Sequence, residues 1–398
     1  MNNPTFPETI YLDYQATTPV DPRVLEAIRP YQEQGFANPA SNHAAGHAVR
    51  AAVEAARDAV AASFNADPLG LVFTSGATEA NNLALKGLAE QYGSEKRHLI
   101  SSRAEHSAVM DVLEHLGEQG FDMTIIPHDS EGRLRMDRLA EAFRPDTLAV
   151  SLMAANNEVG TIHDIAAIGR LAKKHGAFFH CDAAQLAGKA AIDVQEAGID
   201  LLTWSAHKFY GPPGCGGLWV RRKQPRVRLA TQIHGGGHQR GFRSGTLNVP
   251  GIIGTAAALA LCEAEHAQDH QHAARLGRLL QQELAEVEGG YLINGTREPR
   301  LANNLNLRFP GIAADRLLKR IPELAVSQGA ACSSHLPGPS RVLLAMGQTP
   351  AQAREALRFS WGRFTTADEI TRAAALLSEA VAWCRNQPQE AEEAGCSL

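Results

Sequence analysis

A lysine follows an apolar segment near the middle of the chain. Lys208 comes after the run 200–206 and just before a turn rich in glycine and proline, 211–214. At such a position a lysine is either a surface cation or a nucleophilic amine. Burial beside other cations favours the second role, in which the amine forms a Schiff base with a carbonyl. The lysine alone does not decide between the two.

An acidic residue ends a second apolar segment. Asp182 lies at the end of the run 177–183, where a carboxylate is costly unless it has a partner. It is either the cap of a following helix or an anion that faces the protonated ring nitrogen of pyridoxal phosphate. One strand–helix–strand step separates Asp182 from Lys208, so both side chains can reach the same crevice.

An anion site is indicated by residues 73–82, which have the pattern of a strand, a glycine turn and a helix start. The first N–H groups and the dipole of a helix attract anions, although an ordinary Ser/Thr cap gives the same pattern. Neither GxGxxG nor GxxxxGK[ST] occurs, which disfavours dinucleotide and P-loop sites.

His106 comes after the run 98–102. It is either the cap of a helix or a ring that stacks on a planar cofactor and moves protons.

The elements that must position these residues alternate along the first two thirds of the chain. Short, nearly all-apolar runs are typical of parallel strands covered on both faces. The pattern therefore predicts an α/β domain with a mostly parallel sheet and helices on both faces, with its ligand at the carboxyl ends of the strands. We expect strands at 71–75, 98–102, 123–128, 147–154, 177–183 and 200–206, and helices at 53–64, 107–120, 136–143 and 165–176.

The pattern changes after about residue 250. One long helical region is expected over 251–288, followed by strands at 302–309 and 324–329 and helices at 350–357 and 367–385. This mixture predicts a smaller α+β domain.

The composition excludes several classes of protein. The chain has 398 residues and a formal net charge of −5, which is unfavourable for binding nucleic acid. No apolar run is long enough to span a bilayer, and the N-terminus lacks a signal pattern, so we expect a cytoplasmic protein. His234 and His238 are separated by three glycines. They therefore do not lie on a helix, and no metal is predicted.

Six cysteines are present, and no pair has the CxxC spacing of a zinc ribbon or a thioredoxin-type site. Cys332 lies in the segment 326–340, whose small residues, glycines, prolines and serines predict a mobile surface loop. A cysteine there has no packing role and can act as a nucleophile. The other five are expected to be structural: Cys181, Cys215, Cys262, Cys384 and Cys396.

Taken together, these features resemble the cysteine desulfurases of the class V aminotransferase family, which have the pyridoxal-phosphate fold type I. The resemblance covers roughly residues 10–385. It differs at Gln15, where a smaller polar residue is more usual, and at Ala37 and Ala206, where glycine is more usual. The matching segments are 11–19, 38–41, 74–82, 105–106, 156–160, 182–185, 205–211, 234–238, 243–246, the Cys332 loop and 358–360.

The resemblance implies a role for each matching residue. Lys208 would carry pyridoxal 5′-phosphate, Asp182 would pair with its ring nitrogen, and His106 would stack on the ring and shuttle protons. Gln185 and Asn157 would bind near the ring oxygen and the substrate carboxylate, and Arg358 would grip that carboxylate. The phosphate would be held by Ala77, Thr78, Ser205 and His207, and by Thr246 from a neighbouring subunit of a homodimer.

The implied reaction removes sulfur from L-cysteine, leaving L-alanine and a persulfide on Cys332 for transfer to an acceptor protein. The expected domains are 16–255, and 1–15 with 256–398, with the catalytic loop at 328–340. The acceptor stays open among iron–sulfur assembly, nitrogen fixation, tRNA thiolation and DNA sulfur modification. An aminotransferase or selenocysteine lyase of the same fold is the alternative enzyme, although a transaminase needs no loop cysteine. A silent sulfur-carrier or interaction subunit is the alternative from another class.

Overall fold

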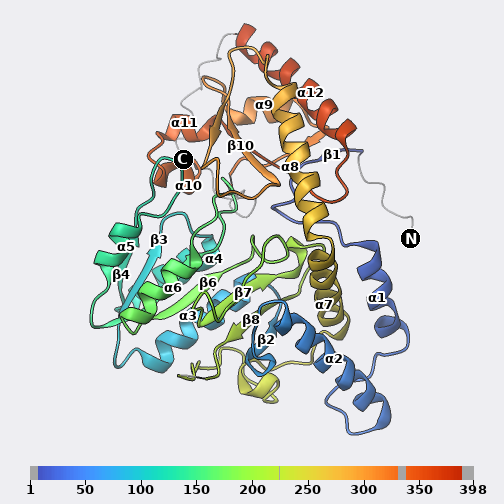
Figure 1. The fold of residues 1–398 in the computed structure, drawn as a ribbon, viewed down its shortest axis with the longest axis vertical. Coiled ribbons are helices and arrows are strands. Elements are labelled where there is room, and N and C mark those ends of the chain that lie inside the picture. Colours follow the sequence, from blue (N-terminus) through green and yellow to red (C-terminus); the bar gives the residue numbers. More distant parts are fainter. Residues whose placement is uncertain (1–7, 224, 330–337, 388–398) are drawn as a thin grey trace, which may run out of the picture.

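A seven-stranded sheet lies at the centre of the structure, a computed structural model that describes residues 8–223, 225–329 and 338–387 (Figure 1). Its strand order is β2-β8-β7-β6-β5-β3-β4. The strands are β2 (Leu71–Thr74), β3 (His98–Ser102), β4 (Asp122–Ile126), β5 (Thr147–Met153), β6 (Phe178–Asp182), β7 (Leu201–Ser205) and β8 (Gly216–Val220).

The sheet is mostly parallel, as predicted. The neighbouring pairs from β4 through β3, β5 and β6 to β7 are all parallel. The exception is β8, which runs antiparallel between β7 and β2. The sequence did not indicate β8 because it begins with two glycines, and glycine is depleted in strands.

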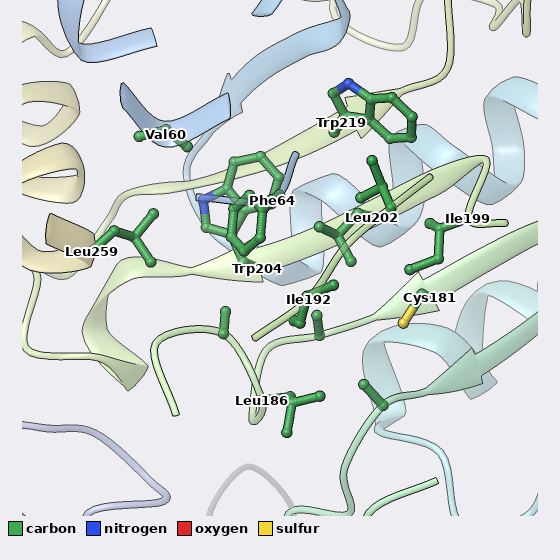
Figure 2. Packing of buried hydrophobic residues seen from close by; sticks show 14 of the residues in the cluster. Val60, Phe64, Cys181, Leu186, Ile192, Ile199, Leu202, Trp204, Trp219 and Leu259 are labelled. Carbon is green, nitrogen blue, oxygen red and sulfur yellow. The ribbon is translucent and has the colours of Figure 1, made fainter. Parts of the chain in front are cut away.

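Helices cover both faces of this sheet, which also confirms the prediction. One face packs against α3 (Ala77–Tyr92) and α4 (Ser107–Glu118). The other packs against α2 (Ala44–Ala62), α5 (Met136–Ala142), α6 (Ile165–Lys174) and α7 (Val249–Ala264). In this second layer the Trp204 ring lies beside Phe64, with centroids 5.2 Å apart, between Leu202 and Leu259 (Figure 2).

A second hydrophobic core surrounds a three-stranded antiparallel sheet of order β12-β10-β9, drawn above the central sheet in Figure 1. Residues near the N-terminus join it, since β1 (Ile10–Tyr11) pairs with β11 (Leu324–Ala325). The other elements here are α8 (His266–Glu283), β9 (Leu292–Asn294), β10 (Asn304–Arg308), α9 (Ala314–Arg320), α10 (Arg341–Ala345), α11 (Pro350–Arg354), β12 (Ala356–Ser360) and α12 (Ala367–Asn386). Helix α1 (Pro22–Glu33) connects β1 to the central layers.

Two predictions of this part were wrong in detail. The expected helix over 251–288 is two helices that break at Glu265, where the backbone leaves helical geometry. The expected helix over 350–357 ends at Arg354, and Ala356 already begins β12. That strand pairs with β10 along its whole length, so tertiary pairing overrides the local helical pattern. None of the helices in the described ranges combines the length and apolar character needed to cross a membrane.

Candidate active site

A cavity of about 280 Å³ lies at the carboxyl ends of β6 and β7, beneath the second core. It brings together ten of the residues predicted for the site: Ala77, Thr78, His106, Asn157, Asp182, Gln185, Ser205, His207, Lys208 and Arg358. Thr246 is exposed and is not among the described residues that line the cavity. Cys332 and most of the expected loop 328–340 lie outside the described residues.

Lys208 is presented to the cavity by a short 3₁₀ turn, η2 (Ala206–Lys208), which directly follows β7. Its Nζ donates to the carbonyl oxygens of Gln15, at 2.7 Å, and Ala16, at 2.8 Å. The turn is fixed from the same segment, because Thr18 donates its N–H and its hydroxyl to the His207 carbonyl. The chain near the N-terminus therefore sets the position of the amine.

Asp182, the last residue of β6, is held by a chain of buried hydrogen bonds. Asn81 donates from Nδ2 to Asp182 Oδ2 over 2.8 Å, and Thr203 donates to Asn81 Oδ1 over 2.7 Å. Because the Asp182 carboxylate only accepts hydrogen bonds, it fixes the Asn81 amide with its nitrogen toward Asp182 and its oxygen toward Thr203. The backbone N–H of Ala184 binds the other oxygen, Oδ1. These contacts satisfy the desolvated carboxylate and aim it in one direction.

His106 is the N-cap of α4, and its Nδ1 accepts from the Ala108 N–H over 3.1 Å. A neutral ring that accepts at Nδ1 carries its proton on Nε2. Its neighbour Glu105 is only 4% exposed. Burial raises the pKa of Glu105 to about 8, with a smaller contribution from Asp182, although Ser102 donates to one carboxylate oxygen.

The N-terminus of α3 forms an anion cradle. Gly76, the N-cap, has φ +156°, a conformation that a side chain rarely adopts. The first N–H groups of this 16-residue helix, and the positive end of its dipole, lie at the cavity, which Ala77 and Thr78 line. Ser205 lies across from Gly76, since a Cβ on Gly76 would lie 3.4 Å from its Oγ. Burial, helped by Lys208 and Lys189, lowers the pKa of His207 to about 4, so its ring is a neutral donor or acceptor.

Arg358, on β12, is 1% exposed and closes the cavity from the side of the second core. It donates to Asp13 Oδ1 over 2.7 Å and to the Asn157 carbonyl over 2.9 Å. Its Nε has no hydrogen-bond partner among the described residues. An arginine with an unused donor suits a substrate carboxylate.

Gln15, which lines the cavity, and Lys189, which lies beside it, were not assigned a role from the sequence. Gln15 lines it at 1% exposure, and its Nε2 has no partner in the described part of the chain. The only available signal was the departure from the smaller residue expected at that position. Lys189, which donates to Gln185 Oε1 over 3.2 Å, gave no signal in the sequence.

These residues fit pyridoxal phosphate. The cradle at Gly76 suits a phosphate group, Asp182 suits a protonated ring nitrogen, and Lys208 supplies an amine between them. The buried unpartnered donor of Gln15 indicates that the cavity takes a polar ligand.

The cysteines within the described ranges are buried and are poorly suited to act as nucleophiles. Cys181, Cys215, Cys262 and Cys384 are free and buried, and burial raises the pKa of each thiol. Such thiols are poor nucleophiles, which agrees with the structural role predicted for them. Over the same ranges, no three His, Cys, Asp or Glu side chains are grouped in a way that could hold a metal ion.

Comparison with known proteins points to one family. Residues 10–373 match the family described as Aminotransferase class-V. The chain is 47% identical over 377 residues to cysteine desulfurase IscS of Methylococcus capsulatus, covering 94% of this chain and 93% of that protein. It resembles the solved structure of a NifS-like protein with a TM-score of 0.88 and 34% identity, over 94% of this chain and 100% of the other. A structure described as SspA in complex with cysteine matches with a TM-score of 0.78 and 36% identity, over 89% and 99% of the two chains.

Proposed function

The chain belongs to the class-V aminotransferase family and, within it, to the cysteine desulfurases, and from this premise we propose how its own residues take sulfur from L-cysteine. Enzymes of this family use pyridoxal 5′-phosphate, and this chain does so too. When bound, the cofactor withdraws electrons from the substrate's α-carbon. The observation that carries the proposal is the meeting of Lys208, Asp182 and Arg358 in one cavity.

The cofactor would be held by residues from both ends of the cavity. Lys208 would be the covalent anchor, and Asp182 would be the partner of the ring nitrogen. His106 would lie against the ring and move protons through its Nε2. The phosphate would be bound by the backbone at Ala77 and by the side chains of Thr78, Ser205 and His207, and Gln185 would donate to the ring oxygen.

The substrate would be oriented by its carboxylate. Arg358 and Asn157 would hold this group and so fix the orientation of L-cysteine in the cavity. The Cys332 thiolate forms a bond to the sulfur of L-cysteine as the substrate's carbon–sulfur bond breaks. The electron pair of that bond stays with the substrate carbon, which takes up a proton, so that L-alanine leaves and a persulfide remains on Cys332.

The test is a Cys332→Ser variant, with Cys396→Ser as the matched control. We expect Cys332→Ser to lose alanine release and persulfide formation, both measured under single turnover, while its visible absorbance is retained. Lys208→Ala should lose the absorbance after dialysis. Persulfide formation by Cys332→Ser at the wild-type rate would contradict the role of Cys332. Absence of alanine release from the wild-type protein would favour the alternative of a silent carrier subunit.

A homodimer would complete the site. Thr246 is exposed and is not among the described residues that line the cavity of its own subunit, and we propose that it reaches the phosphate in the partner subunit. Light scattering gives the subunit number. Mixing Thr246→Ala with Lys208→Ala subunits should then produce hybrid dimers in which one of the two sites has both residues, and activity should reappear. Mixtures that stay inactive would argue against a shared site.

We also propose the division into domains 16–255 and 1–15 with 256–398, which the two separate cores support. A cytoplasmic location suits the reaction, since the attacking thiol must stay reduced.

The acceptor of the persulfide sulfur is a protein. Capture of the persulfidated enzyme with its partner would show which of the four pathways it serves.

A further inference from the structure

Lys189 lies directly behind the cofactor site and has no part in the function proposed above. It follows β6 in a tight turn, four residues after Gln185, and its Nζ donates to the Gln185 carbonyl over 2.9 Å and to Gln185 Oε1 over 3.2 Å. The turn depends on Gly188, which has φ +73° and would meet Phe209 Cβ at 2.6 Å if it carried a Cβ. The backbone thus places Lys189 against the rear of Gln185.

A lysine ammonium only donates hydrogen bonds. When Lys189 is charged, the side-chain oxygen of Gln185 therefore faces it, and the nitrogen faces the other way. This nitrogen donates to the Gln15 carbonyl over 3.0 Å, the same oxygen that accepts from Lys208 Nζ at 2.7 Å. Gln185 itself lines the cavity.

We propose that Lys189 is a positioning residue that locks the Gln185 carboxamide with its nitrogen, a donor, toward the cofactor cavity. Without Lys189, the Gln15 carbonyl alone would hold the amide in this orientation, so the nitrogen of Gln185 would be held less firmly toward the ring oxygen of the cofactor. The inference rests on the proposed function, because it assumes that Gln185 faces this ring oxygen.

The charge of Lys189 adds a second effect. Burial, with help from the cations Lys208 and Arg358, lowers the pKa of Lys189 to about 7, while Cys262 opposes the shift. On its other side Lys189 lines a cavity of about 240 Å³, together with His266, Asp269 and Arg300. A cation so close to Lys208 disfavours a further proton at the cofactor linkage, most strongly on the acid side of pH 7.

The test uses the resting holoenzyme without substrate and follows its visible absorbance from pH 5 to 10. Lys189→Met keeps a long side chain but removes the donors and the charge, and it should raise the midpoint of the titration by about 0.5 unit or more. Lys189→Arg, which keeps hydrogen-bond donors and stays charged over the whole range, should not raise the midpoint. Lys174→Met is the matched control, since Lys174 is exposed at the end of α6.

A second measurement, of cofactor binding, tests separately whether Lys189 orients the Gln185 amide. In a Gln185→Leu background there is no amide to orient, so Lys189→Met should weaken cofactor binding by a smaller factor than it does in the wild-type background. Equal factors in both backgrounds, or an unchanged midpoint in Lys189→Met, would overturn the proposal. A wild-type absorbance that survives Lys208→Ala would instead overturn the proposed function, so the two failures are distinguishable.

Discussion

The guanidinium of Arg358 donates to Asp13 Oδ1 over 2.7 Å, and Asp13 Oδ2 in turn accepts from Ser327 over 2.7 Å. Three segments far apart in the sequence therefore meet through one carboxylate. Since the Asn157 carbonyl binds a second arginine nitrogen, the guanidinium is fixed before any substrate arrives. Such fixed donors reduce the ordering cost of binding.

Replacing Arg358 with lysine keeps the charge but loses this geometry. We expect the KM for L-cysteine to rise by about 10- to 100-fold, because a hydrogen bond to a charged group is worth about 1.5–3 kcal/mol. The kcat should change less, as for loss of a contact that substrate and transition state share. Steady-state kinetics test this, with the exposed Arg354→Lys as control. A KM within about twofold of wild type, which is about 0.4 kcal/mol, would show that another group holds the carboxylate.

Asn81 links Asp182 to Thr203, and both its amide groups are used. Asn81→Ala leaves a buried carboxylate oxygen and a buried hydroxyl without these partners. The free energy of unfolding should fall by about 1–3 kcal/mol, measured by urea denaturation of the cofactor-free protein. The neighbouring Asn82→Ala loses only an exposed contact to the Thr78 carbonyl and is the control. Equal losses of unfolding free energy in the two variants would show that the buried hydrogen bonds of Asn81 do not stabilise the fold.

The central sheet and most of its site could be predicted from the sequence. Asp182 ends one short apolar strand and Lys208 follows another, and parallel strands bring such ends to one edge of a sheet. That reasoning needs only local patterns and the rule for parallel sheets.

The remaining features depend on contacts between distant segments. Gln15 enters the cavity because β1 and the segment after it join the second core, where Asn304 binds its side chain. Strand β12 forms because it pairs with β10, against its local helical pattern. The role of Lys189 arises from a turn that packs against Phe209. No periodicity in the sequence reports such pairings.

Glu105 makes stability depend on pH. A glutamate in the unfolded chain has a pKa near 4.3, whereas burial raises the pKa of Glu105 to about 8. Between these values the folded state binds a proton that the unfolded state has lost, so stability falls as pH rises. The contribution is complete below the unfolded pKa and is lost as pH rises through about 8.

Glu105→Gln keeps a neutral side chain at every pH. Relative to this variant, wild type should lose up to about 4 kcal/mol of unfolding free energy between pH 5 and pH 8. Urea denaturation of both proteins across this range measures the difference, and the exposed Glu114→Gln should follow wild type. Parallel curves for wild type and Glu105→Gln would mean that Glu105 is ionised in the folded protein.

The buried side-chain nitrogen of Gln15 lowers the stability of the cofactor-free protein and is available to bind a ligand. Its Nε2 is buried without a partner among the described residues, while its Oε1 accepts from Asn304 over 2.6 Å. A buried unsatisfied amide costs about 1–3 kcal/mol, and Asn304 also donates to the Glu158 carbonyl. Gln15→Leu should therefore leave the unfolding free energy of the cofactor-free protein unchanged or higher.

Gln15→Leu should also weaken binding of L-cysteine or of the cofactor by about tenfold, because the side-chain nitrogen that would donate to the ligand is lost. Calorimetric titration of the two ligands measures the binding, and thermal unfolding measures the stability. A variant that binds both ligands normally would show that the unpartnered amide of Gln15 does not serve either of them.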